Sequence, residues 1–209
     1  GRFSPNDYFE IERFLYSNNL IKPEDTAFYY DNGFMIIHSN HQYKVGVFSD
    51  LMETGFETLG KDALKNFHVG ISRMHHYKEN LATAVAESCY AASFHNDATA
   101  VYLEYGALKT YQAILPYANQ SYMQNYAQDY ISPLAKYDSE KHSEILPTVI
   151  EFVQCGGDLE KTGDKMSQHK NTIRNRLKKA GEILDLNPFA LGDYESLAMA
   201  VRIHICSGQ

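Results

Sequence analysis

The sequence predicts an α+β protein, with an N-terminal mixed sheet covered by helices and a C-terminal, all-α helix-turn-helix domain. Helical and strand-like patterns alternate up to residue 118, and no convincing strand follows residue 143. Positive charge is concentrated in one short helical segment of the second part. We therefore expect an α/β domain at residues 1–118, a helical connector at 119–142 and the helix-turn-helix domain at 143–209.

The composition is that of a folded chain in water. The 209 residues are 44% hydrophobic and 22% charged, and no apolar run approaches the roughly 20 residues that span a bilayer. The N-terminus has no secretory signal and no initiator Met, so we expect a C-terminal fragment of a longer protein. Cys89, Cys155 and Cys206 lack CxxC spacing, which implies neither a disulfide framework nor a zinc site. The expected compartment is a reducing cytoplasm, with no membrane partner.

In the first part, apolar residues at spacings of three and four indicate helices, and short β-prone runs indicate strands. Asp31-Asn32-Gly33 between two such runs is a hairpin signal. The long Ala-rich helix is expected to bury one stripe, formed by Leu81, Val85, Cys89 and Ala92. Along the chain, the patterns predict helix 8–18, strands 27–30 and 34–38, helix 41–59, strand 66–72, helix 77–94, strand 98–102 and helix 107–117.

Caps and helix breakers divide the second part into helices. The polar, Tyr-rich segment 120–142 is interpreted as a helix plus connector. Ser143 is the expected N-cap of a helix running to Val153, with Pro147 in the first turn, where a missing N–H costs little. Gly156-Gly157 is expected to end this helix.

Two short helices and a closing one follow. Asp158 is the expected cap of a helix that ends at Met166, and Ser167 is the expected cap of the helix after it. Pro188 then interrupts the chain, and residues 197–205 are expected to form a final amphipathic helix. Two short helices joined by a tight turn are typical of a helix-turn-helix.

The second of these short helices carries a local excess of positive charge. Segment 165–179 contains six Lys and Arg and no Asp or Glu, whereas the whole chain has 19 basic against 26 acidic residues. The rest of the chain therefore has a net charge of −13. This concentration predicts a local surface for a polyanion, and DNA is the first hypothesis.

One face of this helix, expected at residues 168–180, should pack, and the other should read operator DNA. The packing stripe follows helical spacing: Met166, Ile173, Leu177, Ala180 and Leu184. Gly163 suits a close approach of the two helices. Arg and Lys can donate to guanine, Asn can bond adenine in a bidentate way, and cations toward the far end more often hold phosphates. The candidate DNA-binding residues are His169, Lys170, Asn171, Thr172, Arg174, Asn175, Arg176, Lys178 and Lys179.

Residues 157–184 resemble the C-terminal helix-turn-helix of the PucR/CdaR family of bacterial transcriptional regulators. Runs 133–138 and 144–149 resemble the same family's lead-in, and the helix at 197–205 also fits. The resemblance implies a regulator that binds operator sites in double-stranded DNA as a homodimer, with a small-molecule effector sensed by a part upstream. The positions that match the family pattern are Thr162, Met166, His169, Asn171, Thr172, Arg176 and Leu177.

Four positions depart from that pattern. Gly163 replaces the usual Ala and Gln168 a usual Val, and both are expected to loosen the bundle slightly, since Gly in a helix costs roughly 1 kcal/mol against Ala. Lys170 replaces Arg and Asn175 replaces Tyr, which is expected to alter the bases that are read. The positive outer face is retained.

Residues 26–115 are similar in element order to the degenerate GGDEF-like domain of such regulators, and run 69–72 resembles its best-kept strand. The resemblance implies a regulatory or dimerisation role for residues 1–118. An active GGDEF domain holds nucleotide phosphates and Mg²⁺, which usually needs two acidic ligands, whereas hairpin 30–34 offers only Asp31. We expect no enzyme activity, cofactor or metal site. The alternative is a nucleotide-binding or nucleotidyl cyclase-like domain in residues 26–115.

Several features have plainer interpretations. A basic helix is often only a solvated face, and a helical domain can be an interaction module. His169 is either a DNA contact or a residue that packs at the start of its helix. Surface positions are favoured over metal binding for His68, His75 and His76, because adjacent histidines do not face one another. The tyrosines of segment 102–137 are expected to pack helices against the sheet instead of lining a ligand pocket.

Overall fold

The computed structural model describes residues 9, 12–13, 15–17, 21, 23, 25–30, 33–38, 68–76, 81–94 and 102–208. The chain divides into two compact units. The described residues of the predicted helix 8–18 are helical, and the predicted helix 41–59 lies outside the described residues. No helix in the described part of the chain is long and apolar enough to cross a membrane. The first unit comprises Gly1–Val69, Met74–Asn80 and Thr99–Tyr102. The second unit comprises Gly70–Arg73, Leu81–Ala98 and Leu103–Gln209.

The first unit contains the predicted hairpin. Strands β1 (Thr26–Tyr30) and β2 (Gly33–Ile37) are antiparallel, with Tyr30 opposite Gly33, so that two residues connect them. The rings of Tyr29 and Phe34 lie opposite each other on the two strands, with centroids 5.6 Å apart in an edge-on arrangement. Such cross-strand aromatic pairs fix the register of a hairpin.

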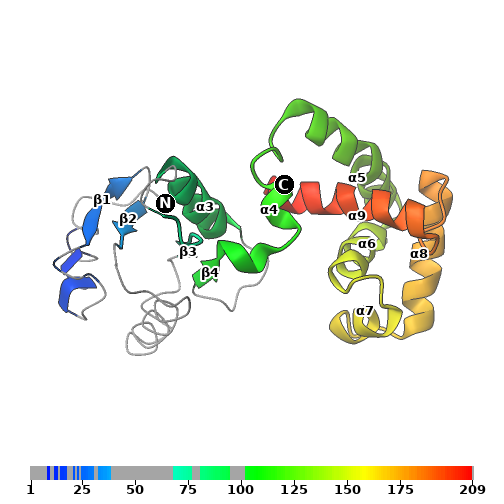
Figure 1. The fold of residues 1–209 in the computed structure, drawn as a ribbon. Coiled ribbons are helices and arrows are strands. Elements are labelled where there is room, and N and C mark those ends of the chain that lie inside the picture. The colour runs from blue at the N-terminus through cyan, green and yellow to red at the C-terminus, as the bar shows by residue number, and fades with distance from the viewer. Residues whose placement is uncertain are drawn as a thin grey trace. The chain divides into compact units, whose positions relative to one another are not determined.

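The expected mixed sheet is replaced by two separate pairs of strands in the described residues. The second pair consists of β3 (Val69–Ile71) and β4 (Tyr102–Glu104) (Figure 1). β3 lies within the predicted strand 66–72, whereas β4 extends beyond the end predicted for strand 98–102. A GGDEF-like domain is not confirmed by this arrangement.

The predicted packing stripe of helix α3 (Leu81–Ser93) is only partly confirmed, since Val85, Cys89 and Ala92 are partly buried. Leu81 is 56% exposed, and the buried side chains are those of Glu87 and Ala91. Strand β3 lies close to the helix, because a Cβ at Gly70 would lie 2.0 Å from the Ser88 carbonyl oxygen and 2.3 Å from the Ala92 backbone nitrogen. The strand thus sets which face of the helix is covered.

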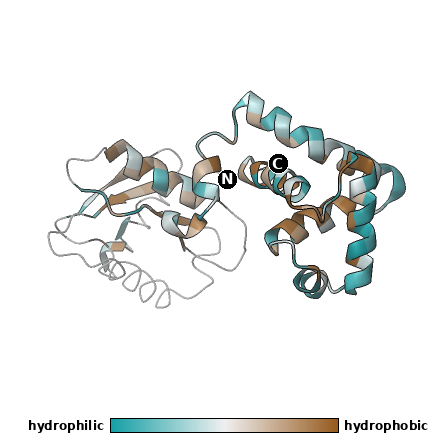
Figure 2. Ribbon diagram, turned by 45° about the vertical axis from the view of Figure 1, so that its right-hand side comes forward, coloured by the Kyte–Doolittle hydropathy of each residue, from teal (hydrophilic) through white to brown (hydrophobic). Residues whose placement is uncertain are grey.

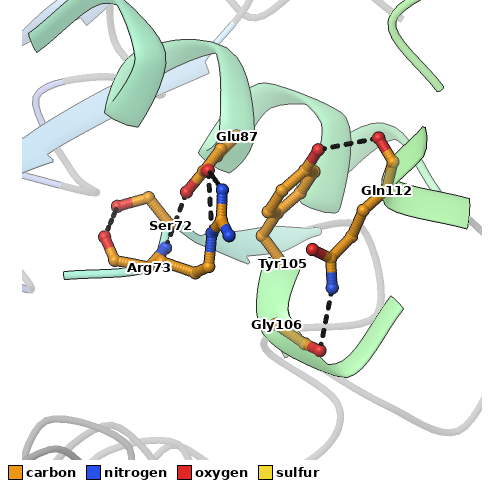
Figure 3. Close-up of polar contacts among 6 residues, drawn as sticks. All are labelled: Ser72, Arg73, Glu87, Tyr105, Gly106 and Gln112. Carbon is orange, nitrogen blue, oxygen red and sulfur yellow. Dashed lines mark hydrogen bonds and ion pairs between the residues drawn. The ribbon is translucent and has the colours of Figure 1, made fainter. Parts of the chain in front are cut away.

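A charged pair explains why Glu87 points inward. Its carboxylate accepts hydrogen bonds from the Arg73 backbone N–H at 3.0 Å and from Arg73 Nε at 2.9 Å, and it also pairs with Arg73 Nη2 (Figure 3). The Arg73 guanidinium lies 5.4 Å from the Tyr105 ring centre. The pKa of Arg73 is raised by the hydrogen bond and the charge of Glu87. A buried carboxylate is tolerated here because it is paired.

The predicted helix 107–117 is shorter and broken. A 3-10 turn η1 (Tyr105–Leu108) and a single helical turn α4 (Tyr111–Ile114) flank Lys109, whose φ of 49° interrupts the helix. Tyr105 donates its hydroxyl to the Gln112 carbonyl oxygen at 3.0 Å, and the Gln112 amide donates to the Gly106 carbonyl oxygen at 3.0 Å (Figure 3). These side chains close the turn that leads into the helical region.

Five helices form the C-terminal region and share one core. The segment interpreted as a helix plus connector is one continuous helix from Ser121 to Lys141, and the closing helix begins before the predicted residue 197. The helices are α5 (Ser121–Lys141), α6 (Ile145–Gln154), α7 (Leu159–Lys165), α8 (Lys170–Leu184) and α9 (Leu191–Cys206) (Figure 1). The buried core is formed by Ile131, Leu134, Ile145, Val149, Phe152, Val153, Ile173, Leu177, Ala180, Leu197, Ala198 and Val201.

The start of α6 differs from the sequence prediction in its cap. Ser143 does not cap the helix; the Asp138 carboxylate, from the end of α5, accepts hydrogen bonds from the backbone N–H groups of Ile145 and Leu146 at 2.8 Å each. Ser143 donates its hydroxyl to the same carboxylate. Asp138 prevails because a carboxylate can satisfy several of the free N–H groups at a helix start.

Candidate nucleic-acid interface

Helix α7 begins where the sequence predicts. The Asp158 carboxylate accepts hydrogen bonds from the backbone N–H groups of Lys161 at 3.1 Å and Glu160 at 2.9 Å. These hydrogen bonds lower the pKa of Asp158, and the one from Lys161 has the larger effect. Thr162, fully buried, donates its hydroxyl to the Asp158 carbonyl oxygen at 2.6 Å. Asp158 is therefore confirmed as the cap of α7.

The turn between α7 and α8 is tight and packs back against Gly163, which lies within α7. The Gln168 N–H donates to the Gly163 carbonyl oxygen at 2.8 Å. A Cβ at Gly163 would lie 2.6 Å from the Gln168 carbonyl oxygen, closer than side chains are found to backbone. The expected close approach at Gly163 is confirmed, and the geometry of this turn leaves no space for the methyl group of Ala.

Helix α8 is capped by His169 and not by Ser167. Ser167 has a φ of 53°, a left-handed conformation within the turn, whereas His169 has the extended backbone of an N-cap. The His169 Nδ1 accepts a hydrogen bond from the Asn171 backbone N–H at 3.2 Å. The turn geometry thus moves the cap two residues beyond the position that residue type suggested.

The packing stripe of α8 is confirmed. Ile173, Leu177 and Ala180 are fully buried, and Met166 and Leu184 are partly buried against the same core. Figure 2 shows α8 with a hydrophobic side toward the other helices of the bundle and a hydrophilic side away from them. This stripe places α8 against α5, α6 and α7.

The candidate DNA-binding residues divide by exposure. Thr172, Arg176 and Lys179 are partly buried along the edges of the packed face. The other candidates are exposed: His169, Lys170, Asn171, Arg174, Asn175 and Lys178. Four of these define what we call the outer ridge: Asn171, Arg174, Asn175 and Lys178.

Ion pairs divide the same residues further. Lys170 Nζ lies 2.7 Å from Glu160 Oε1, and both side chains are exposed. Lys179 Nζ lies 2.8 Å from Glu182 Oε2 and 5.5 Å from the centre of the Tyr137 ring. The pKa of Lys179 is raised, mainly by its hydrogen bond with Glu182. Surface pairs of this kind contribute little to stability.

Arg176 has the most extensive contacts among the candidates. Its Nη2 lies 2.8 Å from Glu144 Oε2, and its Nη1 donates to Thr148 Oγ1 at 3.3 Å. By contrast, no acidic side chain in the described residues pairs with Arg174 or Lys178. These two cations therefore carry the charge of α8 that is not neutralised within the described protein.

Sequence reasoning missed the acidic partners of α8. Glu144 and Glu160 lie on other segments, and nothing in their spacing from Arg176 or Lys170 signals a contact. Only the pair of Lys179 with Glu182, three residues apart on one helix, follows from spacing alone.

Comparison with known proteins agrees with the helical geometry. The family model for the PucR C-terminal helix-turn-helix domain matches residues 145–203, from the start of α6 into α9. No curated protein and no solved structure matched the chain. Residues 145–203 are thus similar to the PucR C-terminal helix-turn-helix domain, which supports a PucR-family regulator and suggests a DNA-binding transcriptional regulator.

Proposed function

We propose that the protein regulates transcription by binding operator sites in double-stranded DNA through the outer ridge of α8. The observation that carries the proposal is the composition of the ridge, which has two Asn, one Arg and one Lys, all exposed and none acidic. Arg174 and Lys178, one turn apart, have no acidic partner in the described residues. A helix presenting such residues suits the major groove.

Each ridge residue has a distinct proposed role. Asn171 and Asn175 lie one turn apart, and amide side chains can bond adenine through two hydrogen bonds. Arg174 can donate to guanine O6 and N7, and Lys178, further from the start of the helix, can hold a phosphate. Asn and Arg are therefore expected to set base preference, and Lys to set position.

Lys170, His169 and Lys179 complete the proposed contact surface at its margins. The exposed pair of Lys170 with Glu160 is weak enough for a DNA phosphate to replace the carboxylate. Thr172 is partly buried and adjoins the ridge. We assign these residues to the backbone of the duplex, where contacts fix register without reading sequence.

We further propose that the regulator acts as a cytoplasmic homodimer. Two copies of α8 would then lie about 34 Å apart along one face of the duplex, and the operator would contain an inverted or direct repeat. A small-molecule effector would be sensed upstream, with residues 1–118 serving regulation or dimerisation. The alternative, a nucleotidyl cyclase-like enzyme in residues 26–115, gains no support from the comparisons.

The test is a salt titration of DNA affinity for the full chain, measured by fluorescence anisotropy with a labelled random-sequence duplex. Lys178→Gln is expected to weaken binding and to lower the slope of log K against log salt by about 0.9, the loss of one phosphate contact. The matched control is Lys109→Gln, which removes one exposed cation from the turn before α4. Equal affinities for wild type and Lys178→Gln across the salt range would refute the proposal.

A further inference from the structure

Arg176 differs from its neighbours on α8 in direction. It stands two residues from both Arg174 and Lys178, and two residues correspond to about 200° around a helix of 3.6 residues per turn. Its side chain is only 22% exposed, because it lies along the edge of the packed face toward α6. Arg176 therefore cannot share the face that the outer ridge presents.

The contacts of Arg176 join α8 to the first turn of α6. The guanidinium bridges Glu144, the residue that precedes α6, and Thr148 within the helix. Thr148 is fully buried, and its hydroxyl accepts from Arg176 while donating to the Glu144 carbonyl oxygen. The buried hydroxyl is thus satisfied in both directions, and the guanidinium is held at two points.

A two-point contact restrains α8 in a way that the apolar stripe does not. Leu and Ile side chains pack without direction, so a helix held by them alone can turn or slide by small amounts. A guanidinium fork adds geometric specificity to its energy. The bridge fixes the rotation of α8, and with it the direction in which the outer ridge faces.

We propose that Arg176 is a positioning residue, bridged to Glu144 and Thr148, that orients the outer ridge of α8 for DNA instead of contacting DNA itself. This inference rests on the proposed function. It replaces the direct DNA contact that the sequence suggests for Arg176. It also gives Glu144, although negatively charged, an indirect role in binding the negatively charged DNA.

Glu144→Gln is expected to change DNA affinity in opposite directions, depending on whether Arg176 contacts DNA or positions α8. Were Arg176 a DNA contact, Glu144→Gln would free its guanidinium and remove a negative charge, and both effects would raise DNA affinity. With Arg176 as a positioning residue, Glu144→Gln removes the same charge, but the loosened bridge is expected to outweigh this gain and to lower the affinity. The sign of the change therefore separates the two.

The test is a double-mutant cycle of Glu144→Gln and Arg176→Gln, with Lys178→Gln as reference, in the salt titration of the full chain. Each single variant of the bridge is expected to lose affinity by about fivefold, with an unchanged salt slope. The double variant is expected to lose no more than either single one, since coupled neighbours are not additive. A lower slope for Arg176→Gln, or tighter binding by Glu144→Gln, overturns the inference.

The same experiment distinguishes this inference from the proposed function. A Lys178→Gln variant with the affinity of wild type counts against DNA binding by the ridge, whereas a tighter Glu144→Gln variant counts only against the bridge. Hydrogen exchange of the DNA-free protein supplies a second readout. Both bridge variants are expected to exchange faster in α8 and in the first turn of α6, and unchanged exchange there would contradict the bridge.

Discussion

Gly163 shows how one missing side chain shapes the candidate interface. Its backbone lies against Gln168 in the turn before α8, and a Cβ there would meet the Gln168 carbonyl oxygen. Gly192, in the first turn of α9, has nothing within 4 Å of a built Cβ. The two glycines are both helical, so that they differ mainly in available space.

We predict opposite effects of Ala at these two glycines. Gly192→Ala is expected to stabilise the fold by up to about 1 kcal/mol, through helix propensity alone. Gly163→Ala is expected to destabilise it by about 1 kcal/mol, because overpacking against backbone exceeds the same gain. Denaturant unfolding of both variants measures the difference, and a stabilised Gly163→Ala would show that the turn can yield.

Caps illustrate what residue type can and cannot predict. Asp158 was predicted correctly because it bonds the N–H groups of residues two and three positions ahead, a local contact. Ser143 and Ser167 were predicted wrongly. The start of α6 is capped by Asp138, which belongs to another helix. Ser167 has a left-handed backbone within the turn, so His169 is the N-cap of α8 instead.

At the scale of elements, the pair of Arg73 and Glu87 ties strand β3 to helix α3. The burial of the two partners is unequal, since the Glu87 side chain is 4% exposed and that of Arg73 is 55% exposed. Loss of the guanidinium therefore removes the positive charge that compensates a buried carboxylate, whereas loss of the carboxylate charge leaves a largely solvated Arg73. The two substitutions should not be equivalent.

We predict that Arg73→Ala destabilises the second unit more than Glu87→Gln does. The expected cost of Arg73→Ala is about 1–3 kcal/mol, that of a buried group deprived of its partner. Glu87→Gln keeps the shape and one acceptor oxygen, and a smaller loss is expected. Thermal unfolding of both variants gives the order, and the reverse order would mean that Glu87 is solvated.

Elements were predictable where their pattern is local or repeated. The hairpin followed from its turn residues, and the buried face of α8 from the spacing of Ile173, Leu177 and Ala180. The buried face of α3 was only partly predictable, because most of its side chains are small and a single glycine on β3 decides the contact. In an Ala-rich helix, the faces differ too little in side-chain size and hydrophobicity for the sequence to indicate which one is buried.

At the scale of the whole molecule, the helix-turn-helix depends on a helix outside its family match. α5 places Ile131 and Leu134 in the core shared by α6, α8 and α9. The Tyr126 hydroxyl donates to the Ser196 carbonyl oxygen at 3.1 Å, which joins α5 to α9. The domain boundaries at 118 and 142 stay a prediction that fragments can test.

We predict that fragment 119–209 folds cooperatively and that fragment 143–209 does not. The shorter fragment lacks Ile131 and Leu134, and loss of even one such buried side chain to Ala costs about 2–5 kcal/mol. Leu134→Ala in the longer fragment serves as an intermediate case. Circular dichroism during denaturation compares all three, and equal stability of the two fragments would make α5 dispensable.

The sequence was sufficient to predict the helix of the candidate site and its positive charge. It was not sufficient to predict which of the basic residues remain free to contact DNA. The sequence identified α8 and its outer residues, yet neutralisation by Glu144 and Glu160 depends on packing between helices. Those contacts reduce a broad basic face to the ridge around Arg174 and Lys178. Charge counting along a helix overstates the surface that is free for a ligand.

The central claim is that the outer ridge distinguishes base pairs, and selection of duplexes from a random pool tests it most directly. Wild type and Asn171→Ala are selected in parallel, with Lys109→Gln as control. The wild type and the control should recover one shared motif, and Asn171→Ala should lose preference at a fixed position by about 1–3 kcal/mol. Recovery of no motif by the wild type, or of an unchanged motif by Asn171→Ala, would contradict the account.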